Sequence, residues 1–216
     1  MTTTAGTGET PVILWFRRDL RLHDNPALER AFGTGRPVLC LYVLDPAQAG
    51  RAPGAASLWW LDKSLRALAA SLAERGGRLI LRRGDSEAEL RRLIAETGAD
   101  AVYMNRLFEP EGFTRDADIA HALKAEGVEC HGYNGTVLTR PGSVLNGSGG
   151  PYKVFTPFLK ALLAQAEAPP HTLGPRDMAG APKVASDDID DWGLHPTRPD
   201  WSGGFDWTPG EAGATE

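Results

Sequence analysis

The feature that most constrains the fold lies near the start of the chain, where an apolar run leads directly into a dense cluster of charge. Residues 12–16 (VILWF) are continuously apolar over the length of a strand, which is typical of a strand covered on both faces in a parallel sheet. Asn25 followed by Pro26 predicts a helix start, with Asn25 as the N-cap. The turn between them holds Arg17, Arg18, Asp19, Arg21, His23 and Asp24. This is more charge than a short turn needs, and the carboxyl ends of strands are where open α/β sheets bind ligands.

The chain alternates short apolar runs with helical patterns as far as about Gln165, which is typical of a parallel sheet flanked by helices. The predicted strands are residues 12–16, 38–43, 79–82, 101–104 and 129–133. Five strands joined by right-handed crossovers make a doubly wound, Rossmann-like sheet. We therefore predict an α/β fold with a five-stranded parallel sheet, followed by an irregular C-terminal connector.

Helix signals separate the predicted strands. Leucines recur at intervals of three and four over residues 58–72, and glycines follow at 76 and 77. Ser86 and Glu89 fit a capping box for the next helix, and a further helix is expected to begin near residues 112–115. A last helical segment covers residues 155–166, and we expect the preceding GSGG turn to place Tyr152 and Phe155 against the body of the domain.

The 216 residues suffice for one well-buried domain with some tail left over. We expect a loose tail at residues 1–10, the α/β domain at 11–168 and a connector at 169–216, where periodicity disappears. Trp192, Trp201 and Trp207 lie in this connector without enough aliphatic neighbours for a core of their own. They either dock on a partner surface or pack back on the sheet.

Four blocks of sequence carry a resemblance to a known family. They are the strand followed by RRDLR and HDNPAL (residues 17–28), GAASLWWLDKSL (54–65), YMNRLFEP (103–110) and GSGGPYKVFTPF (147–158). In this order they resemble the amino-terminal domain of the DNA photolyase and cryptochrome family. Four ordered blocks are far more specific than any single one.

The resemblance implies a light-collecting α/β domain followed by a larger helical domain that holds flavin adenine dinucleotide (FAD) and damaged DNA. The sequence stops where that second domain would begin. We therefore expect the light-harvesting domain of a deoxyribodipyrimidine photolyase, inactive alone and reaching DNA only through a FAD-binding domain present in cis or in trans. The alternative is a non-catalytic module, either a cryptochrome-like signalling fragment or a nucleotide-binding domain.

The family resemblance and the common doubly wound topology also imply the strand order 3-2-1-4-5. The first and fourth strands would then be neighbours, and the turns that follow them would line one crevice. For an antenna pigment, Arg17 and Arg18 are suited to an anionic tail and Asp19 to a ring N–H or an arginine. From the other turn, Asn105 and Glu109 would meet polar ring edges and Phe108 a ring face. The alternative for each of these residues is a structural role without a ligand. For the turn after the first strand, a further alternative is that its charges simply face water.

The resemblance leaves the pigment open among methenyltetrahydrofolate, a deazaflavin and flavin mononucleotide (FMN). Folate users tend to carry Asn-Glu where Glu111 and Gly112 stand here. Deazaflavin users tend to carry an acidic residue at the position of Leu107. The family's electron-relay tryptophans belong to the helical domain, so Trp59 and Trp60 are expected in a core or an interface.

Several function classes are disfavoured by composition and spacing. A net charge of -5 gives no general attraction to a phosphate backbone. The five histidines show no metal-ligand spacing, and no catalytic triad can be assembled, so we predict neither a metal site nor catalytic residues. Cys40 and Cys130 do not suggest a disulfide framework, and neither a secretory signal nor a membrane-length run is present. We expect a cytoplasmic location.

Overall fold

The computed structural model describes residues 9–46, 52–165, 172, 174–175, 177–178 and 180–214, so most of the expected N-terminal tail lies outside the described residues. Five strands form one parallel sheet in the order β3-β2-β1-β4-β5. They are β1 (Val12–Phe16), β2 (Val38–Leu44), β3 (Leu79–Arg83), β4 (Ala101–Asn105) and β5 (Glu129–Tyr133). The predicted fold class and strand order are confirmed.

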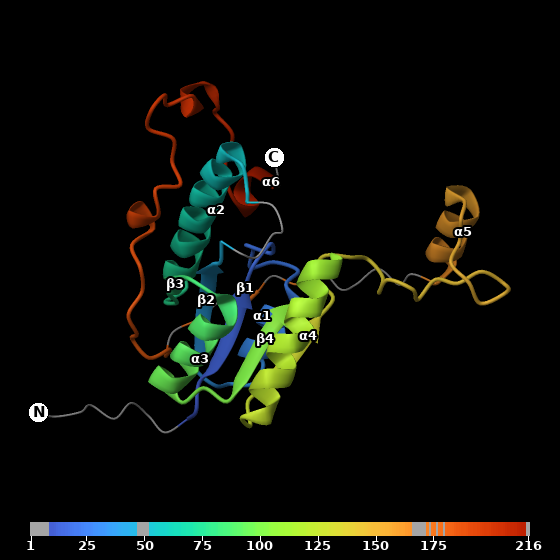
Figure 1. Cartoon of the computed structure of the whole chain (residues 1–216), viewed down its shortest axis with the longest axis horizontal. Coiled ribbons are helices and arrows are strands. Elements are labelled where there is room, and N and C mark those ends of the chain that lie inside the picture. The colour runs from blue at the N-terminus through green and yellow to red at the C-terminus, as the bar shows by residue number, and fades with distance from the viewer. Residues whose placement is uncertain are drawn as a thin grey trace, which may run out of the picture.

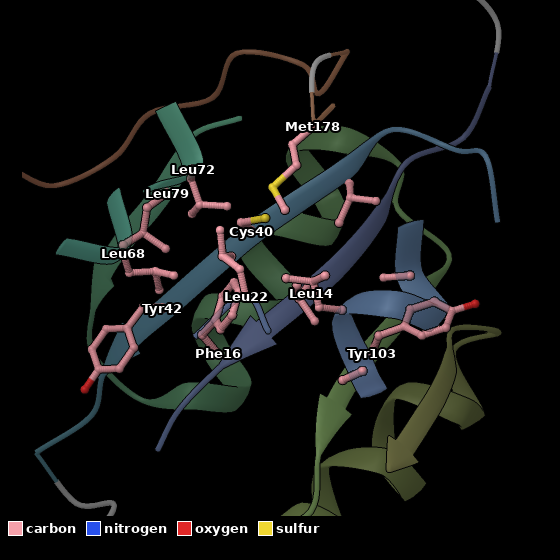
Figure 2. Packing of buried hydrophobic residues seen from close by; sticks show 14 of the residues in the cluster. Leu14, Phe16, Leu22, Cys40, Tyr42, Leu68, Leu72, Leu79, Tyr103 and Met178 are labelled. Carbon is pink, nitrogen blue, oxygen red and sulfur yellow. The ribbon is translucent and has the colours of Figure 1, made fainter. Parts of the chain in front are cut away.

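Helices cover both faces of the sheet (Figure 1). Helices α1 (Pro26–Phe32) and α2 (Ala55–Ala73) pack on one face, and α3 (Ser86–Thr97) and α4 (Pro110–Ala125) on the other. Alternate residues of β1 supply the two cores, with Leu14 and Phe16 on the α1 and α2 side and Ile13 and Trp15 opposite. This burial on both faces explains why the first apolar run is unbroken. Figure 2 shows the core on the α1 and α2 side, where β1 and β2 meet side chains of α2.

The start of α1 follows the prediction, and the starts of α3 and α4 differ from it. Asn25 caps α1, because its side chain accepts a hydrogen bond of 3.1 Å from the Leu28 N–H. The predicted capping box at Ser86 is wrong: Asp85 is the N-cap and accepts from the Ala88 N–H at 2.9 Å. The extended backbone of Asp85 brings its carboxylate over the helix end. Helix α4 likewise begins at Pro110, before the predicted residues 112–115.

The connector packs back on the domain. Trp192 is 7% exposed and lies 6.2 Å from the Tyr42 ring, and Met178 is buried in the same core (Figure 2). The Asp187 N–H donates to the Leu81 carbonyl of β3 at 2.8 Å. Of the two alternatives for Trp192, packing on its own sheet is therefore the one observed.

An arm of residues 134–154 and helix α5 (Phe155–Gln165) projects from the sheet (Figure 1). The arm closes on itself, since the Asn146 N–H donates to the Gly150 carbonyl at 2.8 Å and Tyr152 contacts Phe158. The expectation that Phe155 packs on the body of the domain is wrong, because its side chain is 70% exposed. The GSGG segment forms a local turn within the arm.

Candidate functional site at the carboxyl edge of the sheet

Arg17 is the first residue after β1, and its side chain turns inward. One nitrogen donates to Asp116 of α4 at 2.6 Å, and another donates to the main-chain carbonyl of Asn105. The guanidinium also lies 4.5 Å from the centre of the Trp15 ring. Because only 2% of the side chain is exposed, Arg17 ties β1, β4 and α4 together.

Asn105, the last residue of β4, joins the two predicted turns directly. Its side-chain nitrogen donates to Asp19 at 2.6 Å and to Asn25 at 2.8 Å, and its side-chain oxygen accepts from the Ala27 N–H at 3.3 Å. Asp19 in turn accepts from the Arg17 N–H at 2.8 Å. Asn105 is only 2% exposed and Asp19 4%, so their polar atoms are engaged within the protein. The β1 and β4 turns therefore meet at one edge of the sheet.

Outside this buried network, Arg18 and Glu109 form an ion pair across the same two turns. Their side chains are 60% and 49% exposed, and Phe108 is half-buried. An ion pair this exposed stabilises the fold little and can exchange partners readily. Of the six predicted residues, Arg17, Asp19 and Asn105 hold the turns together, while Arg18 and Glu109 are accessible to a ligand.

A pocket of about 1170 Å³ opens beside the arginine turn. It is lined by Arg17, Arg18 and Asp19, but Asn105, Phe108 and Glu109 are not among its lining residues. Its other walls come from the end of β2, from α2 and from residues 206–214. The pocket thus lies on the β2 side of β1, rather than between β1 and β4 where the crevice was predicted.

The walls of the pocket combine aromatic surface with charge. Tyr42, Trp60 and Trp207 supply rings, and Arg18 and Arg21 supply cations. Burial raises the pKa of Tyr42 to about 12, so its phenol stays neutral and can donate a hydrogen bond. Arg21 donates to the carbonyls of His23 and Asp24, which fixes its position, whereas the exposed Arg18 can reorient.

Sequence reasoning missed the aromatic walls. Tyr42 could have been found, because β2 also neighbours β1 in the predicted order and its last residues reach the same edge of the sheet. Trp60 was expected only as a core or interface residue, although 36% of its surface is exposed. Trp207 comes from the far end of the chain, and no local pattern links it to β1.

The described part of the chain shows neither a metal-binding cluster nor a membrane-spanning helix. No group of three or more histidine, cysteine, aspartate or glutamate side chains is placed to hold a metal ion there. None of the helices described is long and apolar enough to cross a bilayer.

The parallel sheet, its helix layers and a pocket at the carboxyl edge define a doubly wound α/β protein. Residues 12–176 match the model of the DNA photolyase family, so the chain belongs to this family. The predicted membership is confirmed.

Relatives with similar sequences include a photolyase and a cryptochrome. A deoxyribodipyrimidine photo-lyase of Agrobacterium fabrum is 45% identical over 95% of this chain and 43% of its own length. Cryptochrome-1 of Arabidopsis thaliana is 38% identical over 76% of this chain and 24% of its own length. The chain therefore spans less than half the length of these relatives.

Solved structures agree with this relationship. A bacterial class III photolyase from Agrobacterium tumefaciens matches all of this chain and 45% of its own, with a TM-score of 0.90 and 42% identity. An archaeal photolyase from Sulfolobus tokodaii, solved with two FAD molecules, matches 84% of this chain and 40% of its own, with a TM-score of 0.69 and 27% identity. This chain corresponds to the amino-terminal domain of such proteins.

Proposed function

We propose that this chain is the light-harvesting domain of a deoxyribodipyrimidine photolyase and that it holds an antenna chromophore in the pocket beside the arginine turn. The observation that carries the proposal is the pairing of aromatic walls with arginines in a pocket of about 1170 Å³. Cofactor pockets of this volume combine apolar walls with a few well-placed polar groups. Membership in the photolyase family supports the same function.

The pocket fits a planar ring with an anionic tail. Tyr42 and Trp60 offer ring faces and a phenol donor, which suit a flat heteroaromatic group. Arg18 can leave Glu109 to meet a phosphate or carboxylate, since both side chains of that pair are largely exposed. Methenyltetrahydrofolate, a deazaflavin and a flavin such as FMN or FAD all meet this description, so the pigment stays open among them.

When bound, such a pigment supplies absorption of near-ultraviolet or blue light. The residues that line the pocket bind and orient it, and the hydrogen bonds of Arg17, Asp19 and Asn105 hold the β1 turn in place beside it. We place light-dependent repair of pyrimidine dimers in a partner domain that binds FAD and DNA, joined in cis or in trans. Residues 11–168 and the connector at 169–216 remain the proposed division of the chain.

Titration of the purified chain with FMN, FAD, methenyltetrahydrofolate and a deazaflavin, followed by difference absorption, tests the binding proposal. We expect one of them to bind, and Arg18→Ala or Trp60→Ala to weaken its affinity by about tenfold through loss of one polar or stacking contact. Arg30→Ala on α1 and Phe113→Ala on α4 are matched controls outside the pocket. Failure to bind any of these pigments would refute the antenna function.

The similarity to a cryptochrome favours a second candidate, a non-catalytic signalling module. The two candidates differ in what the domain does when joined to a FAD-binding domain. Illumination of pyrimidine dimers with the joined protein should restore intact pyrimidines if the photolyase function is correct. A joined protein that binds pigment and FAD but leaves the dimers unchanged supports the signalling module.

A further inference from the structure

The outer wall of the pocket is a strap formed by residues 201–214. Trp207, Gly210 and Glu211 of the strap line the pocket, and its last turn is the short helix α6 (Glu211–Ala214). Figure 1 shows α6 beside the upper end of α2, after the C-terminal segment has passed around that helix. The pocket therefore takes its shape from segments at opposite ends of the sequence.

One carboxylate fastens the strap to the arginine turn. Glu211 accepts a hydrogen bond of 2.9 Å from the Leu22 N–H and one of 2.7 Å from the His23 N–H. The His23 ring nitrogen Nδ1 lies 2.9 Å from the same carboxylate. Consecutive backbone N–H groups that converge on an anion form a strong, directional site. We call this set of contacts the catch.

The rest of the strap is held by ring contacts on α2, where Trp201, Phe205 and Trp207 lie against the buried Trp59. Trp207 lies 5.9 Å from Trp60 and 6.3 Å from Trp59, yet 61% of its surface remains exposed. The earlier part of the connector is attached differently, because Trp192 is buried and Asp187 is hydrogen-bonded to β3. The rings of the strap are themselves more exposed than Trp192, so the strap opens at a lower free-energy cost than the connector before it.

We propose that the strap is a lid on the pocket and that Glu211 is the positioning residue that closes it. With the catch formed, Trp207 covers the pocket beside Trp60 and slows the loss of a bound ligand. With the catch broken, the pocket opens for exchange. The proposal rests on the proposed function for the identity of the ligand, but closure itself can be measured without a pigment.

A thiol probe in the pocket tests closure directly. Ser64 lines the pocket and is half-buried, so the thiol of a Ser64→Cys variant reports access to the pocket once Cys130→Ser has removed the other partly exposed cysteine. Adding Glu211→Gln should raise the labelling rate of that thiol by a maleimide dye roughly tenfold, because a charge-assisted contact is lost. Glu74→Gln, an exposed residue at the end of α2, is the matched control and should change nothing. An equal labelling rate with and without Glu211→Gln overturns the proposal.

Amide hydrogen exchange separates a lid from a general loss of stability. In Glu211→Gln, exchange should accelerate over residues 201–214 and stay unchanged in β1 and β2. Uniform acceleration throughout the sheet would make Glu211 a structural residue and overturn the proposal.

The pigment supplies the last comparison. If one binds, its dissociation rate should rise about tenfold in Glu211→Gln with little change in the association rate, and an unchanged dissociation rate overturns the lid. If none binds, the proposed function fails, while labelling at position 64 still decides whether the strap closes the pocket.

Discussion

Arg17 and Arg18 are neighbours in the chain with opposite environments. Arg17 is enclosed between Trp15, Asp116 and the end of β4, whereas Arg18 extends from the edge of the sheet toward Glu109. Side chains alternate between the two faces of a strand, but this alternation does not explain the difference, because both arginines follow the end of β1. The buried arginine serves the fold, and the exposed one is available to a ligand.

Substitution of these two arginines should therefore affect stability very differently. Arg17→Ala leaves Asp116 without its buried partner, which should lower the free energy of unfolding by about 3–5 kcal/mol. Arg18→Ala removes an exposed ion pair and should change it by less than about 0.5 kcal/mol. Urea unfolding of both variants measures the difference. Equal losses of stability would contradict the assignment of separate roles.

Cys40 shows how burial changes the chemistry of a single side chain. Its thiol is enclosed in the core beneath α2, and desolvation raises its pKa from 9.0 to about 12 (Figure 2). Unfolding returns the pKa to its ordinary value, so the unfolded chain loses this proton first as the pH rises.

The free energy of unfolding should accordingly fall as the pH rises from 9 to 12. At a pH of about 10.5, ionisation of the unfolded Cys40 thiol should account for about 2 kcal/mol of this fall. Cys40→Ala should show a correspondingly smaller difference between urea unfolding at pH 8 and at that higher pH. The same pH dependence in the variant and the parent chain would contradict this account.

At the scale of the elements, the site depends on where β2 ends and α2 begins, and not on β1 alone. The carboxyl end of β2 contributes Tyr42, and the first turns of α2 contribute Trp60. Both elements were predicted from periodicity, yet their use in a pocket follows from the register that places Tyr42 beside Phe16 of β1. The β1 and β4 turns are joined by direct hydrogen bonds, and the pocket opens on the other side of β1.

At the scale of the whole molecule, the connector completes the domain. It lies along β3, buries Met178 and Trp192 in the core, and ends in the strap over the pocket. The arm with α5 is the opposite case, since none of the residues of α5 is buried. The family relatives extend well beyond the length of this chain.

Trp192 tests whether the connector is part of the fold. Trp192→Ala removes a buried ring from its contact with Tyr42 and should lower the free energy of unfolding by about 3 kcal/mol. Trp192→Phe keeps an aromatic ring in place and should recover much of this loss. Thermal and urea unfolding measure both variants. If Trp192→Ala melts like the parent chain, the packing of Trp192 on Tyr42 contributes nothing to the stability of the domain.

The sequence by itself determined the five strands, the helices between them and membership in the family, because strand and helix periodicity and ordered motifs are local properties. It also singled out the turn after β1, whose residues line the pocket. Only the tertiary structure decided on which side of β1 the pocket lies and that Trp207 and Glu211 line it. Those contacts join residues far apart in the chain. Contacts of this kind produce no repeating pattern in the sequence from which they could be predicted.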